Sequence, residues 1–254
     1  MQAILHGDRG SGFPLLYIPG IDGTGELLLG TASRLEAEFR LLRFAYRADG
    51  DPASDSYAGL AASIAQLCAQ QKIEHCIVVA ESFGGAVSLQ LALDFPKLVQ
   101  GVAIVNSFAR FPNPLRLKLS RALSYFVSRT LFGLCRKHLA PRSLFGRRAH
   151  PEVVKAFRDL PGAFFDESYK RRMDMIAGLD LRPRLPELQQ PLMLFAGDVD
   201  RIVPSLVSMP EIAEGVPQAT FEVIGGGGHV ILPLPEEPWP ERLRELLSRI
   251  SNSS

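Results

Sequence analysis

The chain has 254 residues, 46% of them hydrophobic, and a formal net charge of +1. This length allows one domain with a sizeable core, and the balanced charge does not favour a nucleic acid as partner. The N-terminus lacks the pattern of a secretory signal, and no run approaches the roughly 18 apolar residues of a membrane span. The three cysteines are too scattered for a disulfide framework or a zinc site. We therefore expect a cytoplasmic protein with reduced thiols, no metal and no cofactor.

Strand and helix patterns alternate over the first 105 residues. Short apolar runs predict buried strands at Ile4–Gly7, Leu15–Ile18, Arg40–Tyr46, Cys76–Val79 and Gly101–Val105. Amphipathic runs between them predict helices at Leu27–Phe39, Tyr57–Gln71 and Ala86–Leu93. Alternation of this kind indicates an α/β fold with a mostly parallel sheet covered by helices on both faces.

The alternation stops between residues 106 and 182, where the patterns predict helices and no strand. It resumes with strands at Leu192–Ala196 and Thr220–Ile224 and helices at Ser205–Glu214 and Glu241–Ile250. We therefore predict a single domain over residues 1–254, with residues 106–182 forming a helical cap inserted into it. This insertion is called the cap segment below.

A sharp turn from strand to helix holds the first candidate catalytic residue. The turn is Ala80-Glu81-Ser82-Phe83-Gly84, followed by a second glycine, and small residues let strand and helix approach closely. A serine at the apex of such a turn matches the nucleophile elbow, in which the hydroxyl lies at a helix N-terminus. The alternative is that Ser82 only caps the helix.

A serine nucleophile needs a general base and an acid that orients the base. His229 follows the last predicted strand on a glycine run, so it completes the chain order Ser, Asp, His, although a lone loop histidine could also be solvent-facing. Asp198 and Asp200 both follow the strand at Leu192–Ala196. We favour Asp200 as the acid, because Asp198 adjoins the strand end and suits a bond to backbone groups there.

The reaction also needs donors for a developing oxyanion. The amide of Phe83, directly after Ser82, lies unpaired at a helix N-terminus. The second donor should come from the glycine-rich loop Pro19–Gly25, where we favour the amide of Ile21 over that of Asp22. The same loop could equally be a tight turn chosen for its conformation, and the two interpretations are compatible.

These motifs resemble the serine α/β-hydrolase family, in which the acid ends a Gly-x-x-Asp pattern that falls on Asp200. The loop Pro19–Gly25 together with Glu81–Gly85 is similar, more narrowly, to the plant phytyl ester synthase group and its bacterial relatives. That resemblance implies hydrolysis or transfer of long acyl chains. Members of that group usually carry a further acyltransferase segment with a His-x4-Asp motif, and no histidine here has an aspartate five residues later.

The cap segment combines apolar and basic residues. From residue 106 to 150 every charged residue is Lys or Arg, interleaved with Phe and Leu. One interpretation is a cap packed on the sheet with solvated charges. The other is that cap residues, Phe108 and Phe111 among them, line an acyl pocket with Asp22 over Ser82, while the basic face attracts a lipid surface or an acidic carrier.

The sequence therefore predicts a serine esterase that cleaves a small-molecule acyl ester, with Ser82, Asp200 and His229 as triad and no cofactor. The runner-up is an acyltransferase, in which an alcohol replaces water. A non-catalytic binding protein with the same fold is the alternative from a different class.

Overall fold

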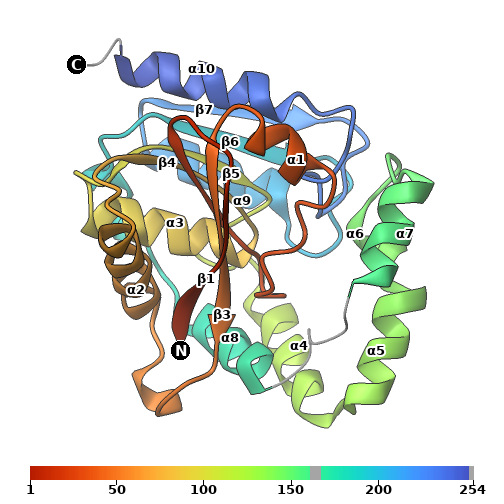
Figure 1. Cartoon of the computed structure of the whole chain (residues 1–254). Coiled ribbons are helices and arrows are strands. Elements are labelled where there is room, and N and C mark those ends of the chain that lie inside the picture. Colours follow the sequence, from red (N-terminus) through yellow and green to blue (C-terminus); the bar gives the residue numbers. More distant parts are fainter. Residues whose placement is uncertain (161–166, 252–254) are drawn as a thin grey trace.

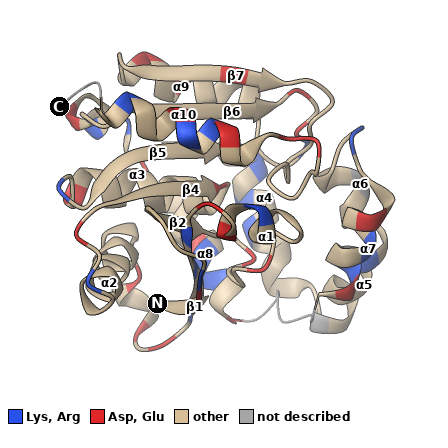
Figure 2. Cartoon of the chain, turned by 45° about the horizontal axis from the view of Figure 1, so that its top comes forward, with Lys and Arg blue, Asp and Glu red and all other residues tan. Residues whose placement is uncertain are grey.

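The computed structural model describes residues 1–160 and 167–251. Over these residues the chain forms a seven-stranded sheet in the order β1-β3-β2-β4-β5-β6-β7, and Figure 2 shows strands from β7 down to β2 lying side by side. Every neighbouring pair is parallel except β1 and β3. The predicted α/β fold with a mostly parallel sheet is confirmed. The strands are β1 (Gln2–Arg9), β2 (Pro14–Ile18), β3 (Arg40–Arg47), β4 (Cys76–Glu81), β5 (Val99–Val105), β6 (Leu192–Gly197) and β7 (Ala219–Ile224).

Helices cover both faces of the sheet (Figure 1). Alternate residues of one strand enter different cores: Val78 and Ala80 of β4 pack with α2, α3 and α9, whereas Ile77 and Val79 pack with α1 and α10. Burial on both faces explains why the central strands read as unbroken apolar runs. The helices on the sheet are α1 (Thr31–Glu36), α2 (Tyr57–Gln70), α3 (Phe83–Asp94), α9 (Ser205–Gly215) and α10 (Trp239–Ser251), and a 3₁₀ turn η1 (Pro52–Ser54) precedes α2.

The helix predicted over Leu27–Phe39 is much shorter in the structure, where only Thr31–Glu36 is helical. Leu27 packs in a small cluster with cap residues, whereas its neighbour Leu28 packs in the core between the sheet and helices α1 and α10. Leu29 has a positive φ of 47°. Two adjacent leucines that enter different cores cannot belong to one regular amphipathic helix, so tertiary packing overrides the periodic pattern here.

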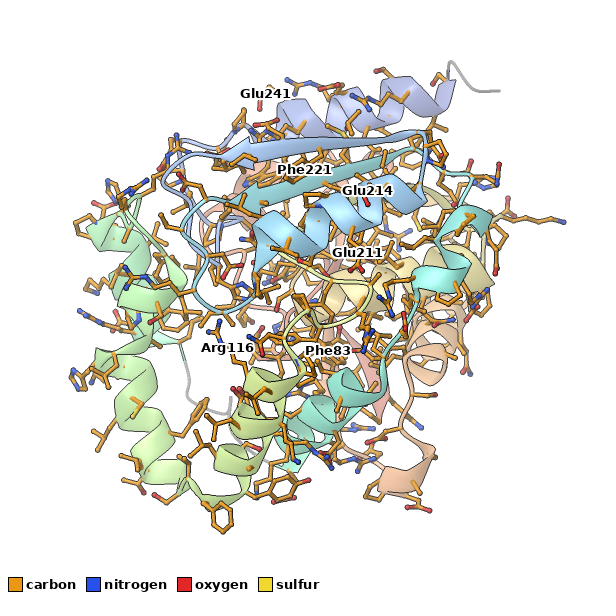
Figure 3. The ribbon with its side chains drawn as sticks, turned by 180° about the vertical axis from the view of Figure 1, so that it is seen from behind. Phe83, Arg116, Glu211, Glu214, Phe221 and Glu241 are labelled. Atoms are coloured by element: carbon orange, nitrogen blue, oxygen red, sulfur yellow. The ribbon has the colours of Figure 1, made fainter. Side chains whose placement is uncertain are left out.

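Between β5 and β6 the chain forms helices that lie beside the sheet, at the bottom and the right of Figure 1. Arg116 of α4, which Figure 3 labels, donates a hydrogen bond to the Arg201 carbonyl in the loop after β6. The described part of the cap segment contains no strand. Among the described residues of the whole chain, no helix is long and apolar enough to cross a membrane. The helices are α4 (Pro114–Phe126), α5 (Arg129–His138), α6 (Ala140–Leu144), α7 (Pro151–Asp159) and α8 (Glu167–Gly178), followed by the 3₁₀ turn η2 (Arg182–Glu187).

At the turn from β4 into α3, strand and helix pass very close to neighbouring parts of the chain. A Cβ atom on Gly84 would lie 2.3 Å from the carbonyl oxygen of Ile18, and one on Gly85 would lie 2.3 Å from the Oγ of Ser107. Real Cβ atoms do not approach oxygen so closely, so only glycine fits at both positions. This contact fixes the start of α3 against β2, and it places the loop after β2 beside Ser82.

We expect Gly84→Ala to destabilise the fold by about 1–3 kcal/mol or more, because the new methyl group meets backbone atoms that have no room to move. Gly133→Ala in α5 is the matched control, since nothing lies within 4 Å of its added Cβ. It should stabilise the protein by about 0.5–1 kcal/mol through helix propensity. Urea unfolding of the two variants checks both signs, and equal unfolding midpoints would contradict the close packing described here.

Candidate active site

Ser82 lies between β4 and α3 with a backbone conformation that serine rarely adopts. Its φ is 55° and its ψ is −125°. Three hydrogen bonds hold the residue there: its amide donates to the Val105 carbonyl at 2.9 Å, and its carbonyl accepts from the Ser107 hydroxyl at 2.6 Å and from the Gly85 amide at 3.0 Å. Backbone strain of this kind persists only where surrounding contacts enforce it, and it concentrates at functional sites.

His229 and Asp200 meet at the same edge of the sheet, from the loops after β7 and β6. The His229 Nδ1 lies 2.9 Å from the Asp200 Oδ2. The carboxylate is held in turn by the Ser205 hydroxyl at 2.6 Å and by the amides of Ile202 and Val203 at 2.8 and 3.1 Å. With every oxygen of Asp200 occupied, the carboxylate has one orientation, and so has the ring that it contacts.

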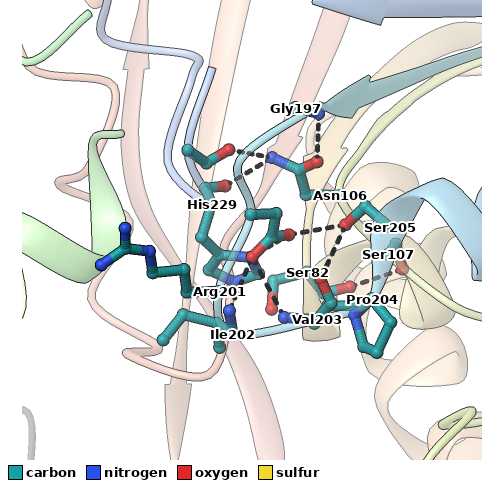
Figure 4. Close-up of polar contacts among 12 residues, drawn as sticks. Ser82, Asn106, Ser107, Gly197, Arg201, Ile202, Val203, Pro204, Ser205 and His229 are labelled. Atoms are coloured by element: carbon teal, nitrogen blue, oxygen red, sulfur yellow. Dashed lines mark hydrogen bonds and ion pairs between the residues drawn. The ribbon is translucent and has the colours of Figure 1, made fainter. Parts of the chain in front are cut away.

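Asn106 joins these two loops, as Figure 4 shows. Its Nδ2 donates to the carbonyls of Gly228 and His229, each at 2.8 Å, and its Oδ1 accepts from the Gly197 amide at 2.8 Å. The side chain is fully buried. Sequence reasoning missed Asn106; the available signal was an asparagine directly after a buried strand, at the edge where the other site residues gather.

Asp198 takes a different role from Asp200. Its Oδ1 accepts from the Gly226 amide at 2.6 Å, and its Oδ2 lies 3.3 Å from the Arg147 guanidinium. The expected backbone bond is therefore present, although the backbone belongs to the glycine run before His229. Asp198 thus stabilises the path of that run while leaving Asp200 to contact the ring.

Burial and charge act in opposite directions on the His229 ring. Burial lowers the pKa of His229, but the adjoining Asp200 carboxylate raises it by charge and by hydrogen bonding, and the pKa ends above its usual value of 6.5. Burial likewise raises the pKa of Asp200, whereas His229, Ser205 and the Ile202 amide lower it, with a net decrease. A pair of this kind favours a charged imidazolium beside an ionised carboxylate.

Ser82 and His229 both line a cavity of about 410 Å³ between the sheet edge and the cap segment. Ser82 and His229 are only 7% and 6% exposed, and among the described residues no hydrogen bond joins them. Apolar side chains from four cap helices form much of the wall, among them Phe132, Leu144, Phe157 and Tyr169. The geometry therefore brings a serine and a histidine–aspartate pair to one apolar pocket.

Phe108 and Phe111, expected to line this pocket, do not reach it. Phe108 is 1% exposed within the core, and Phe111 packs against it with ring centroids 5.4 Å apart. Neither is among the described residues around the cavity. The aromatic residues that do line it come later in the cap segment, because the chain leaves β5 through the core before α4 begins.

The loop after β2 lines the same cavity as His229. Ile21 and Asp22 line the cavity, and no hydrogen bond of the described residues uses the amide of Ile21 or that of Phe83. The buried Arg172 of α8 donates from Nε to the Ile21 carbonyl at 2.8 Å and from Nη2 to the Asp22 carbonyl at 3.4 Å. Sequence reasoning did not identify this anchor, which ties the loop to the cap segment.

Within the described part of the chain, two carboxyl groups near Ser82 each have a buried oxygen without a hydrogen-bond partner. These are the Asp22 Oδ1 and the Glu81 Oε2. The other Glu81 oxygen accepts from the Tyr17 hydroxyl at 2.9 Å. Burial, with a smaller contribution from the charge of Asp22, raises the pKa of Glu81 to about 8, so this carboxyl is protonated at neutral pH.

Among the described residues no group of three or more His, Cys, Asp or Glu side chains is placed to hold a metal ion. The polar groups around the cavity include the Ser82 hydroxyl, the His229 imidazole held by Asp200, the two carboxyl groups just described, and free backbone amides. Such a set can activate a hydroxyl and stabilise negative charge on oxygen.

A model of the alpha/beta hydrolase fold family matches residues 14–234, and the chain belongs to this family. The predicted family is therefore confirmed. The narrower likeness to the phytyl ester synthase group stays a prediction.

The chain is similar over nearly its whole length to proteins named "Putative carbamate hydrolase RutD". The one from Stutzerimonas stutzeri is 26% identical, over 98% of this chain and 97% of that protein. Among solved structures, a thermophilic esterase from Thermogutta terrifontis is 24% identical with a TM-score of 0.82, covering 98% of this chain and 93% of its own. An enol-lactonase from Burkholderia xenovorans is 18% identical with a TM-score of 0.82, covering 97% and 95%. Both structures share the fold with this chain.

The His229–Asp200 contact predicts a specific titration. The imidazole of His229 should titrate above pH 6.5 in the native protein, and in Asp200→Asn it should titrate below pH 6.5, because burial, the largest influence on its pKa, is then no longer opposed by the charge and hydrogen bond of Asp200. Asp198→Asn is the matched control, since Asp198 does not contact the ring. NMR titration of the imidazole signals, with the His229 signal assigned from His229→Gln, measures both. A shift in the control with none in Asp200→Asn would contradict the pairing.

Proposed function

We propose that this protein is a serine hydrolase that cleaves carboxylic esters through an acyl-enzyme on Ser82. The observation that carries the proposal is the His229–Asp200 hydrogen bond on the wall of the cavity that Ser82 also lines. Family membership and the esterase and lactonase folds of similar structures support the broader class of hydrolase. The order Ser82, Asp200, His229 along the chain is the one that α/β-hydrolase triads follow.

In the proposed mechanism His229 takes the proton of the Ser82 hydroxyl as the oxygen attacks the acyl carbonyl. Asp200 fixes the ring orientation and stabilises the imidazolium that forms. The amides of Phe83 and Ile21 donate to the oxyanion, which strengthens their hydrogen bonds as charge develops. His229 then passes its proton to the leaving alcohol, and water resolves the acyl-enzyme by the same steps in reverse. Contacts between serine and histidine tighten when substrate is bound.

The substrate that fits best is an ester with an apolar acyl group. Phe132, Leu144, Phe157 and Tyr169 line the cavity, and its volume lies within the range of small-molecule sites. Apolar walls favour apolar groups because burial of each CH₂ contributes about 0.8 kcal/mol. The proposal requires no cofactor and includes a cytoplasmic location.

Two other reactions use the same groups. An alcohol in place of water would give acyl transfer, which an apolar pocket that holds little water favours. A carbamate in place of the ester would follow the names of the RutD relatives, whose likeness spans almost the whole chain. Both reactions pass through an oxyanion held by the same amides, so the site geometry does not distinguish them from ester hydrolysis. Analysis of the products does.

The decisive experiment is a panel of p-nitrophenyl esters from short to long acyl chains, with a p-nitrophenyl carbamate added. We expect ester hydrolysis by the native protein, and a loss of about a thousandfold or more in Ser82→Ala, because removal of the nucleophile disables the triad. Ser248→Ala is the matched control, since that hydroxyl bonds only its own helix, at Glu245. It should keep full activity.

Two further measurements separate the alternatives. Product partitioning between free acid and ester in the presence of an alcohol identifies acyl transfer, and faster turnover of the carbamate than of any ester identifies carbamate hydrolysis. A fluorophosphonate probe should label the folded native protein and not Ser82→Ala. Equal ester activity in both proteins would place the nucleophile elsewhere, and an unlabelled, inactive native protein would point to a binding protein instead.

A further inference from the structure

The outer face of α4 is apolar and exposed. Leu115, Leu119, Leu123 and Phe126 recur at spacings of four, four and three residues, which places them on one side of a helix. Their exposed fractions are 78%, 61%, 52% and 87%. Leu117, on the opposite side of α4, is buried in the core. The helix is thus anchored by one side, and it presents large apolar side chains to solvent on the other.

The next helix, α5, continues this exposed surface. Leu131 and Leu134 are 52% and 54% exposed, although Phe132 and Cys135 of the same helix line the cavity that contains Ser82. Figures 1 and 3 both draw α4 and α5 at the outer edge of the molecule. We call the following set the docking face: Leu115, Leu119, Leu123, Phe126, Leu131 and Leu134.

The charges that α4 and α5 themselves carry are all positive, although Asp174 of α8 pairs with Arg121 and accepts a hydrogen bond from Tyr125, both on α4. Arg116 and Lys118 flank the apolar stripe of α4 on either side. No Asp or Glu occurs anywhere in residues 106–150, although the chain as a whole has a net charge of only +1. Exposed apolar side chains bordered by cations are the composition of helices that lie in a membrane interface.

The same charges argue against a second copy of the chain as occupant. A two-fold dimer through the docking face would place Arg116 and Lys118 of one copy near those of the other, with no acidic residue from 106–150 between them. An anionic lipid surface supplies both the negative charge and the apolar layer that the docking face lacks.

We propose that the docking face of α4 and α5 binds anionic lipid surfaces in the plane of the headgroups. The apolar side chains insert below the headgroups while Lys118 and its basic neighbours remain at their level. Since α5 lines the cavity from its other side, bound protein would hold the cavity beside the lipid. In that position the cavity would receive apolar esters from the lipid layer and bring them to Ser82. This delivery of substrate rests on the proposed function, whereas the binding to lipid does not depend on it.

Flotation with two kinds of vesicle tests the proposal: phosphatidylcholine alone, and phosphatidylcholine with about one third phosphatidylserine. The native protein should float with the anionic vesicles and much less with the neutral ones, and binding should weaken as salt is raised. The double variant Leu119→Ser, Phe126→Ser should bind at least about tenfold more weakly, since two inserted side chains are lost. Lys118→Glu should reduce the preference for anionic vesicles.

The matched control is Val207→Ser, Val223→Ser, which removes two exposed apolar side chains of α9 and β7. It should bind vesicles as the native protein does, and circular dichroism should show all variants folded. Ser82→Ala should bind fully, so that loss of catalysis and loss of binding are read separately.

Equal binding by the docking-face variant and the control would overturn the proposal, as would equal binding to both kinds of vesicle. A native dimer that Leu119→Ser, Phe126→Ser converts to monomer in sedimentation would also overturn it, by assigning the docking face to a second copy.

Discussion

Three hydrogen bonds from the buried amide of Asn106 hold together the two loops on which the candidate site depends. They join the end of β6 to the backbone of Gly228 and His229, and so they set the distance between His229 and Asp200. Loops after parallel strands are otherwise free to diverge. The Asn106 amide, with both its donor and its acceptor engaged, limits that freedom together with the bonds from Val199 to Gly227 and from Gly226 to Asp198, and its burial raises the cost of breaking any one bond.

Rigidity at this edge extends to the serine. The strained backbone of Ser82 is held by Val105 and Ser107, which flank Asn106 in the chain, so one segment supports the serine and the histidine loop together. On the opposite side of the cavity, Arg172 fixes the carbonyls of Ile21 and Asp22 from the cap segment. The cap segment therefore shapes the candidate oxyanion loop as well as the cavity wall.

Sequence patterns predicted the strands and the turn around Ser82 well, because a central parallel strand is buried on both faces and a tight strand-to-helix crossing demands glycine. They also separated Asp200 from Asp198 by position alone. They failed at Leu27–Phe39, where adjacent leucines serve different cores, and at Phe108 and Phe111, which pack inward. The spacing of apolar residues indicates which residues are buried, but not into which of several cores they pack. Which residues line a pocket depends on that packing.

Glu81 adjoins the nucleophile without adding a full negative charge to its surroundings at neutral pH. An ionised carboxylate at that place would oppose the charge that grows on a reacting carbonyl oxygen, and it would compete with Asp200 for the imidazolium. Burial, together with the charge of Asp22, raises the pKa of Glu81 and so favours its uncharged form, and it outweighs the Tyr17 hydroxyl, whose hydrogen bond favours the carboxylate. The helix terminus of α3 and the ionised carboxylate of Asp200, held against His229, both favour the transition state that the proposed mechanism requires.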